Sequence, residues 1–331
     1  MKISIIRILG GAAFVLAGLL AYYGITFGNS VFLLFILAGV AVIVVAVSGR
    51  RPRGWDIAIF IVGVLVLSGV AAGYAPGNQV TTYSATTAQV HATKIALSVS
   101  ASTGSVSIFF HDKGNLAYQV NFSRSLGPFG FPFAGENTVT NSTSGDVFTL
   151  KIVSSMSGVE IFLRHGYFDF VNISATAGTG SIDLAAPSDE NLGSVSLSTT
   201  TGSVNAVVYS NAIQSLDLHT TTGSISLVSD HLGTTGHKTP VSLSTSLGSL
   251  NVRLNIAANV AVSLKATTGL GNINHDLTPT TTFSITTDKS NDLVASAGNL
   301  DTAPRSFLIS TSTDLGSQNL KIKILQYLAV P

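Results

Sequence analysis

The chain has 331 residues, of which 46% are hydrophobic and only 10% are charged, and its formal net charge is +1. A soluble globular domain usually carries about 25% charged residues, and a balanced charge gives no support for nucleic-acid binding. The absence of cysteine excludes disulfides, thiolate catalysis and zinc or iron–sulfur sites held by cysteine.

The residues up to 75 predict a membrane domain. Three uncharged apolar stretches, 8–25, 31–47 and 57–74, each have about the length needed to cross a hydrocarbon core of roughly 30 Å. They show no amphipathic period, which is typical of helices that are apolar all round. We therefore expect residues 1–75 to form three transmembrane helices in a lipid bilayer.

The basic residues of this region predict its orientation. Lysine and arginine precede the first apolar stretch and fill the loop 48–53, whereas the loop 26–30 has none. The positive-inside rule then places the N-terminus and the 48–53 loop in the cytoplasm. Three crossings would leave residues 75–331 outside the cytoplasm, so the predicted location is the cell membrane, as a multi-pass protein.

Residues 76–94 are rich in Gly, Thr, Ser and Ala and predict a linker. From residue 95 onward a pattern recurs in which apolar and polar residues alternate, a few Ser or Thr follow, and a glycine precedes renewed alternation. Glycine adopts backbone conformations that other residues resist, so we expect turns at the repeated glycines. These are Gly104, Gly158, Gly180, Gly202, Gly223, Gly248 and Gly269.

The spacing of these glycines predicts the fold of residues 95–331. From Gly158 to Gly269 the successive spacings are 22, 22, 21, 25 and 21 residues, and a period in this range is the signature of a solenoid. Alternation with a period of two indicates strands. The expected fold is an all-β solenoid (β-helix) with coils of about 21–22 residues, and a β-sandwich is the alternative.

Stacked strands also account for the low charge of this region. Equivalent positions on neighbouring strands lie about 4.8 Å apart. Two like charges at that distance in water repel by roughly 0.9 kcal/mol, a cost that a ladder of charges would multiply. Serine and threonine can occupy such ladders without this penalty.

The repeats carry a resemblance to a known family. The units Leu-Ser-Thr-Thr-Thr-Gly-Ser-Val at 197–204 and Leu-His-Thr-Thr-Thr-Gly-Ser-Ile at 218–225 resemble the glycine-punctuated adhesin-type domain of unknown function of bacteria and archaea. The resemblance covers roughly residues 94–327 and implies a β-solenoid beside membrane segments. Serine or threonine follows the glycine here, where that family often has an acidic residue. The family supplies no catalytic residues to transfer.

Residues 112–147 interrupt the repeat and predict an inserted loop. Within it, Phe129, Phe131 and Phe133 alternate with glycine and proline. Long loops that leave a regular scaffold often carry binding sites, which makes these residues a candidate interaction loop. Capping one end of the solenoid is the structural alternative for the same residues.

The remaining candidates are modification and metal sites. Asn121, Asn141 and Asn172 each begin an Asn-X-Ser/Thr sequon, and Asn141 is the strongest candidate for glycosylation because we expect it in a loop. Asp230, His231 and His237 are the nearest approach to a metal cluster, but their spacing matches no strong metal pattern. We expect no metal site, no catalytic residue and no cofactor.

These patterns lead to three hypotheses about function. The first is a membrane-anchored, surface-exposed and non-enzymatic adhesin-like module that contacts carbohydrate, envelope polymer or a surface protein. The second is implied by a resemblance to a related envelope-stress sensing family, which combines small membrane helices with a similar β domain. It is an envelope-stress sensor that contacts a membrane signalling partner through its transmembrane helices. A cell-wall glycan enzyme is the third, and it would need a cluster of acidic residues that the sequence does not show.

Overall fold

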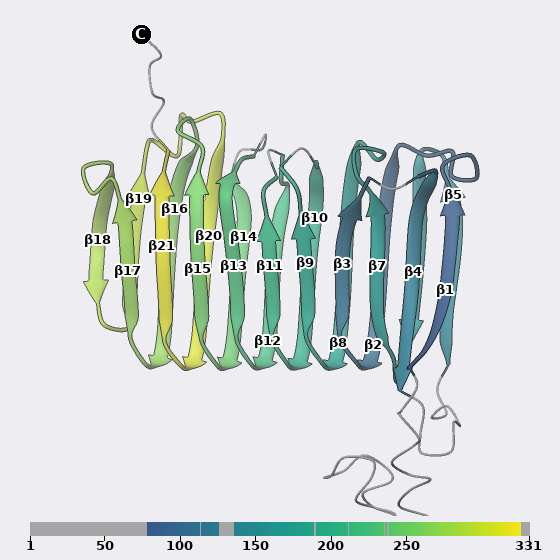
Figure 1. Ribbon diagram of the computed structural model, residues 1–331. Helices are drawn as coiled ribbons and strands as arrows, with labels where there is room; N and C mark the ends of the chain where they lie inside the picture. The colour runs from purple at the N-terminus through teal and green to yellow at the C-terminus, as the bar shows by residue number, and fades with distance from the viewer. Residues whose placement is uncertain are drawn as a thin grey trace, which may run out of the picture. The chain divides into compact units, whose positions relative to one another are not determined.

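The computed structural model describes residues 78–112, 114–125, 136–188, 190–210, 212–234, 236 and 238–325. These residues form an all-β domain of two large sheets in which most neighbouring strands are parallel (Figure 1). Nearly all of the strands belong to one compact unit, residues 80–123 and 134–331. No helix among the described residues is long and apolar enough to cross a membrane. The predicted stretches 8–25, 31–47 and 57–74 lie outside them.

The ten-stranded sheet has a strand order that departs from the order in the chain. Its strands are, in spatial order, β1 (Asn78–Thr86), β4 (Leu116–Ser125), β7 (Gly158–Arg164), β3 (Val106–His111), β9 (Ile182–Ala186), β11 (Val204–Val208), β13 (Ile225–Leu232), β15 (Leu250–Ile256), β21 (Gln318–Ile324) and β17 (Ile273–Thr278).

The eleven-stranded sheet faces it, and the strand pairs follow one another in the same order in both sheets. Its strands are given from the opposite end, beginning with β18. They are β18 (Phe283–Lys289), β19 (Asp292–Ala297), β16 (Ala261–Leu270), β20 (Ser306–Leu315), β14 (Thr239–Leu247), β12 (Ser215–Thr222), β10 (Leu192–Thr201), β8 (Phe170–Thr179), β2 (Lys94–Thr103), β6 (Val147–Ser154) and β5 (Asn137–Ser144).

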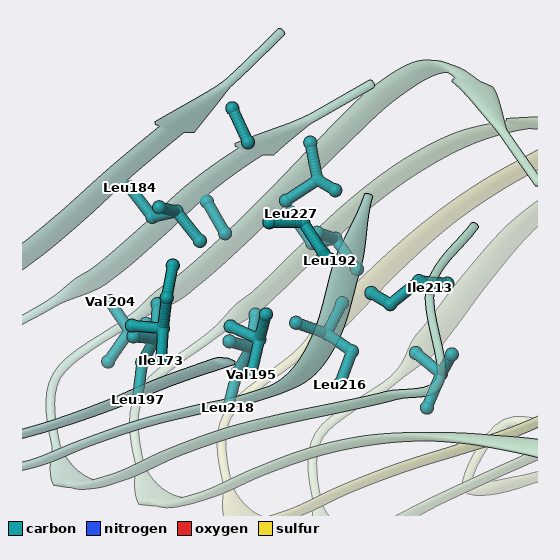
Figure 2. Packing of buried hydrophobic residues seen from close by; sticks show 14 of the residues in the cluster. Ile173, Leu184, Leu192, Val195, Leu197, Val204, Ile213, Leu216, Leu218 and Leu227 are labelled. Carbon is teal, nitrogen blue, oxygen red and sulfur yellow. The ribbon is translucent and has the colours of Figure 1, made fainter. Parts of the chain in front are cut away.

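Each sequence repeat supplies one strand to each sheet, and alternation along the strand decides which side chains enter the core. In β10, Val195 and Leu197 are buried while Ser194 is exposed. Parallel pairing keeps the apolar positions in register, so that Leu197 lies between Ala175 of β8 and Leu218 of β12. Figure 2 shows Val195, Leu197 and Leu218 in the core together with Leu184, Val204 and Leu227, which come from strands of the opposite sheet. The core is therefore one continuous layer between the two sheets.

The turn between the two strands of a repeat is built around a glycine with positive φ. Gly180, Gly202 and Gly223 have φ of 134°, 144° and 142°, a conformation that L side chains rarely adopt. A Cβ added at any of these glycines would also overlap the carbonyl oxygen of the glycine in the neighbouring repeat, as it would at Gly248. Stacking therefore requires glycine at this position for two independent reasons.

Two of the expected turn glycines stand elsewhere. Gly158 begins β7, and the carbonyl of Ser157 takes the place that a glycine carbonyl has in the other repeats. Gly269 lies inside β16, and the positive φ of that repeat, 146°, is at Gly271. Gly269 and Gly271 are two residues apart, so the alternation of side chains between the faces is the same whichever of them lies at the turn. The sequence pattern therefore does not distinguish these two glycines.

At five of the glycine turns a buried threonine ties neighbouring repeats together, whereas Ala101 and Ala177 hold the same position before Gly104 and Gly180. The hydroxyls of Thr199, Thr220 and Thr245 donate to the carbonyls of Gly180, Gly202 and Gly223 at 2.9, 2.9 and 3.0 Å. Thr268 and Thr313 make the same bond to Gly316 and Gly248. Threonine is thus retained inside an apolar core because its hydroxyl satisfies a backbone carbonyl.

Replacing Thr220 by valine tests this bond. The two side chains have the same shape, but valine leaves the carbonyl of Gly202 without the hydroxyl that now donates to it. We expect a loss of about 1–2 kcal/mol in the free energy of unfolding, measured by denaturant titration of the full chain in detergent. Thr221→Val at the exposed neighbouring position is the control, expected within ~0.5 kcal/mol of wild type. Equal effects of the two changes would contradict the role of the bond.

Repeats that follow one another in the sequence are not all neighbours in space. The strand pair β6/β7 lies outside β2/β3, which separates it from β8/β9. At the other end, the last pair, β20/β21, lies between β14/β15 and β16/β17. After β14/β15 the chain therefore leaves room for one strand pair and forms β16/β17 beyond that gap. Its last pair, β20/β21, then occupies the gap.

Antiparallel strands close both ends. The segment expected as an inserted loop, 112–147, contains β4 and β5, which pair antiparallel with β7 and β6. Residues 283–297 form the antiparallel hairpin β18–β19 beside β16. The segment expected as a linker, 76–94, contains β1, which neighbours β4. These strands lie at the ends of the sheets, where a regular repeat would leave unpaired edges.

Asp146 fastens one of these ends through Thr93. The backbone N–H of Thr93 donates to its carboxylate at 2.9 Å and the Thr93 hydroxyl does so at 2.7 Å, and both bonds lower the pKa of Asp146. Because the folded pKa lies below the unfolded value, this contribution to stability is present above the unfolded pKa and is lost as pH falls through the folded pKa.

We therefore expect Asp146→Asn to lower the melting temperature at neutral pH and to have little effect below the folded pKa of Asp146. Thermal unfolding followed by circular dichroism over a pH series measures this difference. Asp288→Asn, at another exposed carboxylate on an end hairpin, is the comparison, since it lacks bonds from a backbone N–H. A destabilisation by Asp146→Asn that persists unchanged at low pH would contradict the assignment.

Candidate functional site

The outward face of the eleven-stranded sheet is covered by hydroxyl groups. We call this surface the hydroxyl face and define it by two rows of side chains that run across the strands in register. The first row is Lys151, Ser98, Ser174, Ser196, Asp217, Ser242, Ser310 and Lys265. The second row is Val153, Ser100, Thr176, Ser198, His219, Ser244, Ser312 and Thr267.

The hydroxyl face is a regular lattice. Neighbouring members of a row are separated by the strand spacing of about 4.8 Å, and the two rows are about 6.6 Å apart along the strands. Each hydroxyl can donate one hydrogen bond and accept two. Such a surface suits an extended ligand that repeats donors and acceptors along its length, because one ligand can then engage several strands.

His219 and Asp217 interrupt the hydroxyls at the centre of the face. Nδ1 of His219 lies 2.8 Å from the hydroxyl of Ser244 on the next strand. Asp217 stands between Ser196 and Ser242 in the first row. The pair concentrates ionisable groups on a single strand, β12, whereas the lysines of the face, Lys151 and Lys265, stand at the two ends of the first row.

The outward face of the ten-stranded sheet differs. One row contains Glu160, Ser107, Asp183, Asn205, Ser226, Asn251, Asn319 and Asn274. The next row contains Phe162, Phe109, Ala185, Val207, Val228, Arg253, Lys321 and Asp276. The rings of Phe109 and Phe162 stack at 5.6 Å. These rows are not among the candidates expected from the sequence. A signal for the first of them is the polar residue that stands two positions after Ser203, Ser224 and Ser249 in successive repeats.

Two positive charges are neighbours in the row of the ten-stranded sheet that begins with Phe162, and nearby carboxylates offset their repulsion. Arg253 and Lys321 occupy paired positions on β15 and β21. The carboxylate of Asp230 lies 3.6 Å from the Arg253 guanidinium, and Asp276 is the paired neighbour of Lys321 on the other side. The repulsion expected for a ladder of like charges is thus offset where two of them meet.

A charged cluster joins three loops at the edge of the domain away from the glycine turns. Nδ1 of His165 lies 2.9 Å from Asp112, and Nε2 lies 3.7 Å from Glu190, whose side chain is 1% exposed. Glu190 also accepts from the N–H of Gly166 at 2.5 Å. This arrangement links the ends of β3 and β7 to the loop before β10. Within the described residues no group of three His, Cys, Asp or Glu is placed to hold a metal ion.

The other candidates from the sequence are dispersed. Asp230 pairs with Arg253, and His237 lies outside the described residues, as do Phe129, Phe131 and Phe133. Asn141 lies in strand β5 rather than in a loop, because the segment completes the edge of the sheet. It is exposed, and its Nδ2 donates to the hydroxyl of Tyr118 at 3.1 Å.

The other two sequons lie in strands whose side-chain amides are engaged. Oδ1 of Asn121 in β4 accepts from Thr82 and Gln119. Oδ1 of Asn172 in β8 accepts from the N–H of Ser194 at 2.8 Å. Of the three sequons, Asn141 alone has an exposed side chain that makes no bond to the backbone in the described structure.

Comparison with known proteins gives structural likeness only. No family model and no curated protein matches the chain. The chain is similar to the crystal structure of a "putative cell adhesion protein" from Clostridium sporogenes, with 12% identity, 74% of this chain and 100% of the other covered, and a TM-score of 0.45.

Two proteins from Parabacteroides distasonis are also similar. One is described as a "putative adhesin", with 9% identity, coverage of 74% and 97%, and a TM-score of 0.22. The other is described as a "putative lipid binding protein", with 11% identity, coverage of 76% and 97%, and a TM-score of 0.25. The likeness is distant, so the function is proposed from this chain's own residues.

Proposed function

We propose that the chain is a membrane-anchored β-solenoid that acts outside the cytoplasm as a non-enzymatic interaction module. The solenoid assignment is supported by parallel pairing between repeats, since the sheets of the alternative β-sandwich are antiparallel. The membrane anchor rests on the apolar stretches within residues 1–75. Residues 75–331 would lie on the outer side of the membrane.

The hydroxyl face carries the functional part of the proposal. Of the seven successive strands from β2 to β16, six present serine or threonine outward in the second row of the hydroxyl face, and β12 presents His219. The core does not require this, because the inward positions of the same strands are filled independently by apolar residues and threonine. An extended carbohydrate or envelope polymer is the proposed ligand, bound by many weak hydrogen bonds in parallel.

Binding to glycans and isolated envelope polymer tests the proposal directly. The full chain in lipid nanodiscs is applied to a glycan array, and Ser198→Glu is compared with wild type. A carboxylate in the centre of the second row would be desolvated against the ligand, so we expect affinity to fall roughly tenfold or more.

Ser226→Glu is the matched control, because it places the same charge on a half-buried serine of the opposite sheet. If Ser226→Glu lowers binding as much as Ser198→Glu, the hydroxyl face is not the binding surface. Absence of binding to any carbohydrate, together with specific co-purification of a membrane kinase by residues 1–75 alone, would favour the envelope-sensing hypothesis instead.

A further inference from the structure

The edge that carries the glycine turns has a composition of its own. We call it the glycine edge, and in Figure 1 it is the lower edge of the sheets. The residue immediately before the turn glycine forms one row along it. In spatial order this row is Thr103, Thr179, Thr201, Thr222, Leu247, Leu315 and Leu270.

The last three members of the row are exposed leucines in adjacent strands. Leu247, Leu315 and Leu270, which we call the leucine ladder, are 46%, 45% and 69% exposed. Threonine occupies the same position in four other repeats, so the turn itself does not require leucine. At the far end of the edge Met156, just before Ser157, is also 46% exposed. Contiguous exposed apolar side chains of this kind mark a contact surface.

Charge is nearly absent from the glycine turns. Among the residues within two positions of Gly104, Gly180, Gly202, Gly223, Gly248, Gly271 and Gly316, Asp314 is the only charged one. Charged residues at this edge do occur at its ends: Lys289 and Asp292 where β18 ends and β19 begins, Glu136 just before β5, and Arg124 at the end of β4. The opposite edge carries Lys94, Asp112, Asp146, Arg164, His165, Asp169, Glu190, Lys238, Asp301 and Arg305.

The described chain also begins at the glycine edge. Figure 1 shows β1 rising from the edge at which β4 ends. The end of β4 lies there because Ser123 pairs with Gly158 in the antiparallel ladder between β4 and β7. The 77 residues before β1 contain the three apolar stretches of membrane-spanning length. The connection to those stretches therefore leaves the domain at the glycine edge.

We propose that the glycine edge lies against the surface of a lipid bilayer, with the leucine ladder among the lipid headgroups. The row of repeats then runs parallel to the membrane, the hydroxyl face stands upright from it, and the charged edge points away. This inference rests on the membrane anchor of the proposed function, but it does not depend on whether that function is adhesion or sensing.

Single-cysteine labelling of the full chain in nanodiscs tests this orientation, because the natural chain has no cysteine. A fluorophore on Asn272→Cys reports beside the leucine ladder, and the same fluorophore on Thr302→Cys reports at the opposite edge, about 30 Å away for strands of about nine residues. With nitroxide-labelled lipid in the disc, we expect strong quenching at position 272 and none at position 302.

The ladder itself is tested by changing Leu247, Leu270 and Leu315 together to threonine, the residue of the other repeats. This triple variant should keep its fold and lose several-fold in lipid quenching at position 272. Leu308→Thr, at another exposed leucine of β20, should leave the quenching unchanged. The triple variant should still bind the ligand of the hydroxyl face, which separates this inference from the proposed function.

Three results would overturn the inference. The first is equal or absent quenching at positions 272 and 302 in a chain that has entered the disc. The second is energy transfer between fluorophores at position 272 of two chains without lipid quenching, which would assign the leucine ladder to a second copy. Failure of the full chain to enter lipid at all would remove both the anchor and the orientation derived from it.

Discussion

Gly223→Ala is expected to destabilise the domain by at least about 3 kcal/mol. The change forces a residue with a Cβ to adopt a φ of 142°, which costs of order 1–3 kcal/mol in strain. The new Cβ also overlaps the carbonyl of Gly202, which accepts the hydroxyl of Thr220. The turn would have to move away from its neighbour and break that bond. For a domain of this size the melting temperature should fall by about 6–12 °C.

Gly145→Ala is the matched control for this prediction. Gly145 also has a positive φ, 59°, but no atom lies within 4 Å of the position its Cβ would take. Strain alone should then cost about 1–2 kcal/mol. Thermal unfolding of the full chain in detergent, followed by circular dichroism, compares the two variants. If Gly145→Ala proves as damaging as Gly223→Ala, contact between stacked turns is not what requires glycine.

Truncation after Arg305 is expected to abolish cooperative unfolding. It removes β20 and β21, which pair with strands on both sides, so their loss leaves two facing edges in each sheet without partners. In an array stacked in sequence order, loss of the last repeat would leave the others paired. Here the outer pair β16/β17 and the hairpin β18–β19 would be separated from the remainder.

Limited proteolysis measures this separation. Residues 257–305 should become the first part of the truncated chain to be cleaved, while truncation after Leu325 should leave the digestion pattern of the full chain. Phe307→Ala gives the same comparison within the full chain, since Phe307 of β20 is fully buried and its loss should cost about 3–5 kcal/mol. Phe283→Ala in the end hairpin should cost less. Retained protection of residues 257–305 would show that the inserted strand pair is dispensable.

Much of the candidate site could be anticipated from alternation alone. In β10 and β12 the apolar residues at 195, 197, 216 and 218 are buried, which places the intervening serines, Asp217 and His219 on the outside. The hydroxyl face follows directly from that pattern. The cluster of Asp112, His165 and Glu190 could not be found in this way, because its members come from three loops separated by 53 and 25 positions in the chain.

The sequence by itself determined the strands of the regular repeats, the position of most turn glycines and the side of the sheet that each residue of those strands faces. These properties are local, since they follow from a period of two and from the conformations open to glycine. Only the tertiary structure decided which repeats are neighbours. Leu247 and Leu270 are both in register with Leu315, and the repeats that carry a turn glycine share the same alternation and the same turn, so these local features do not distinguish which of them are neighbours. The observed order places antiparallel strands at the two ends, and it makes Leu247, Leu315 and Leu270 neighbours along the glycine edge.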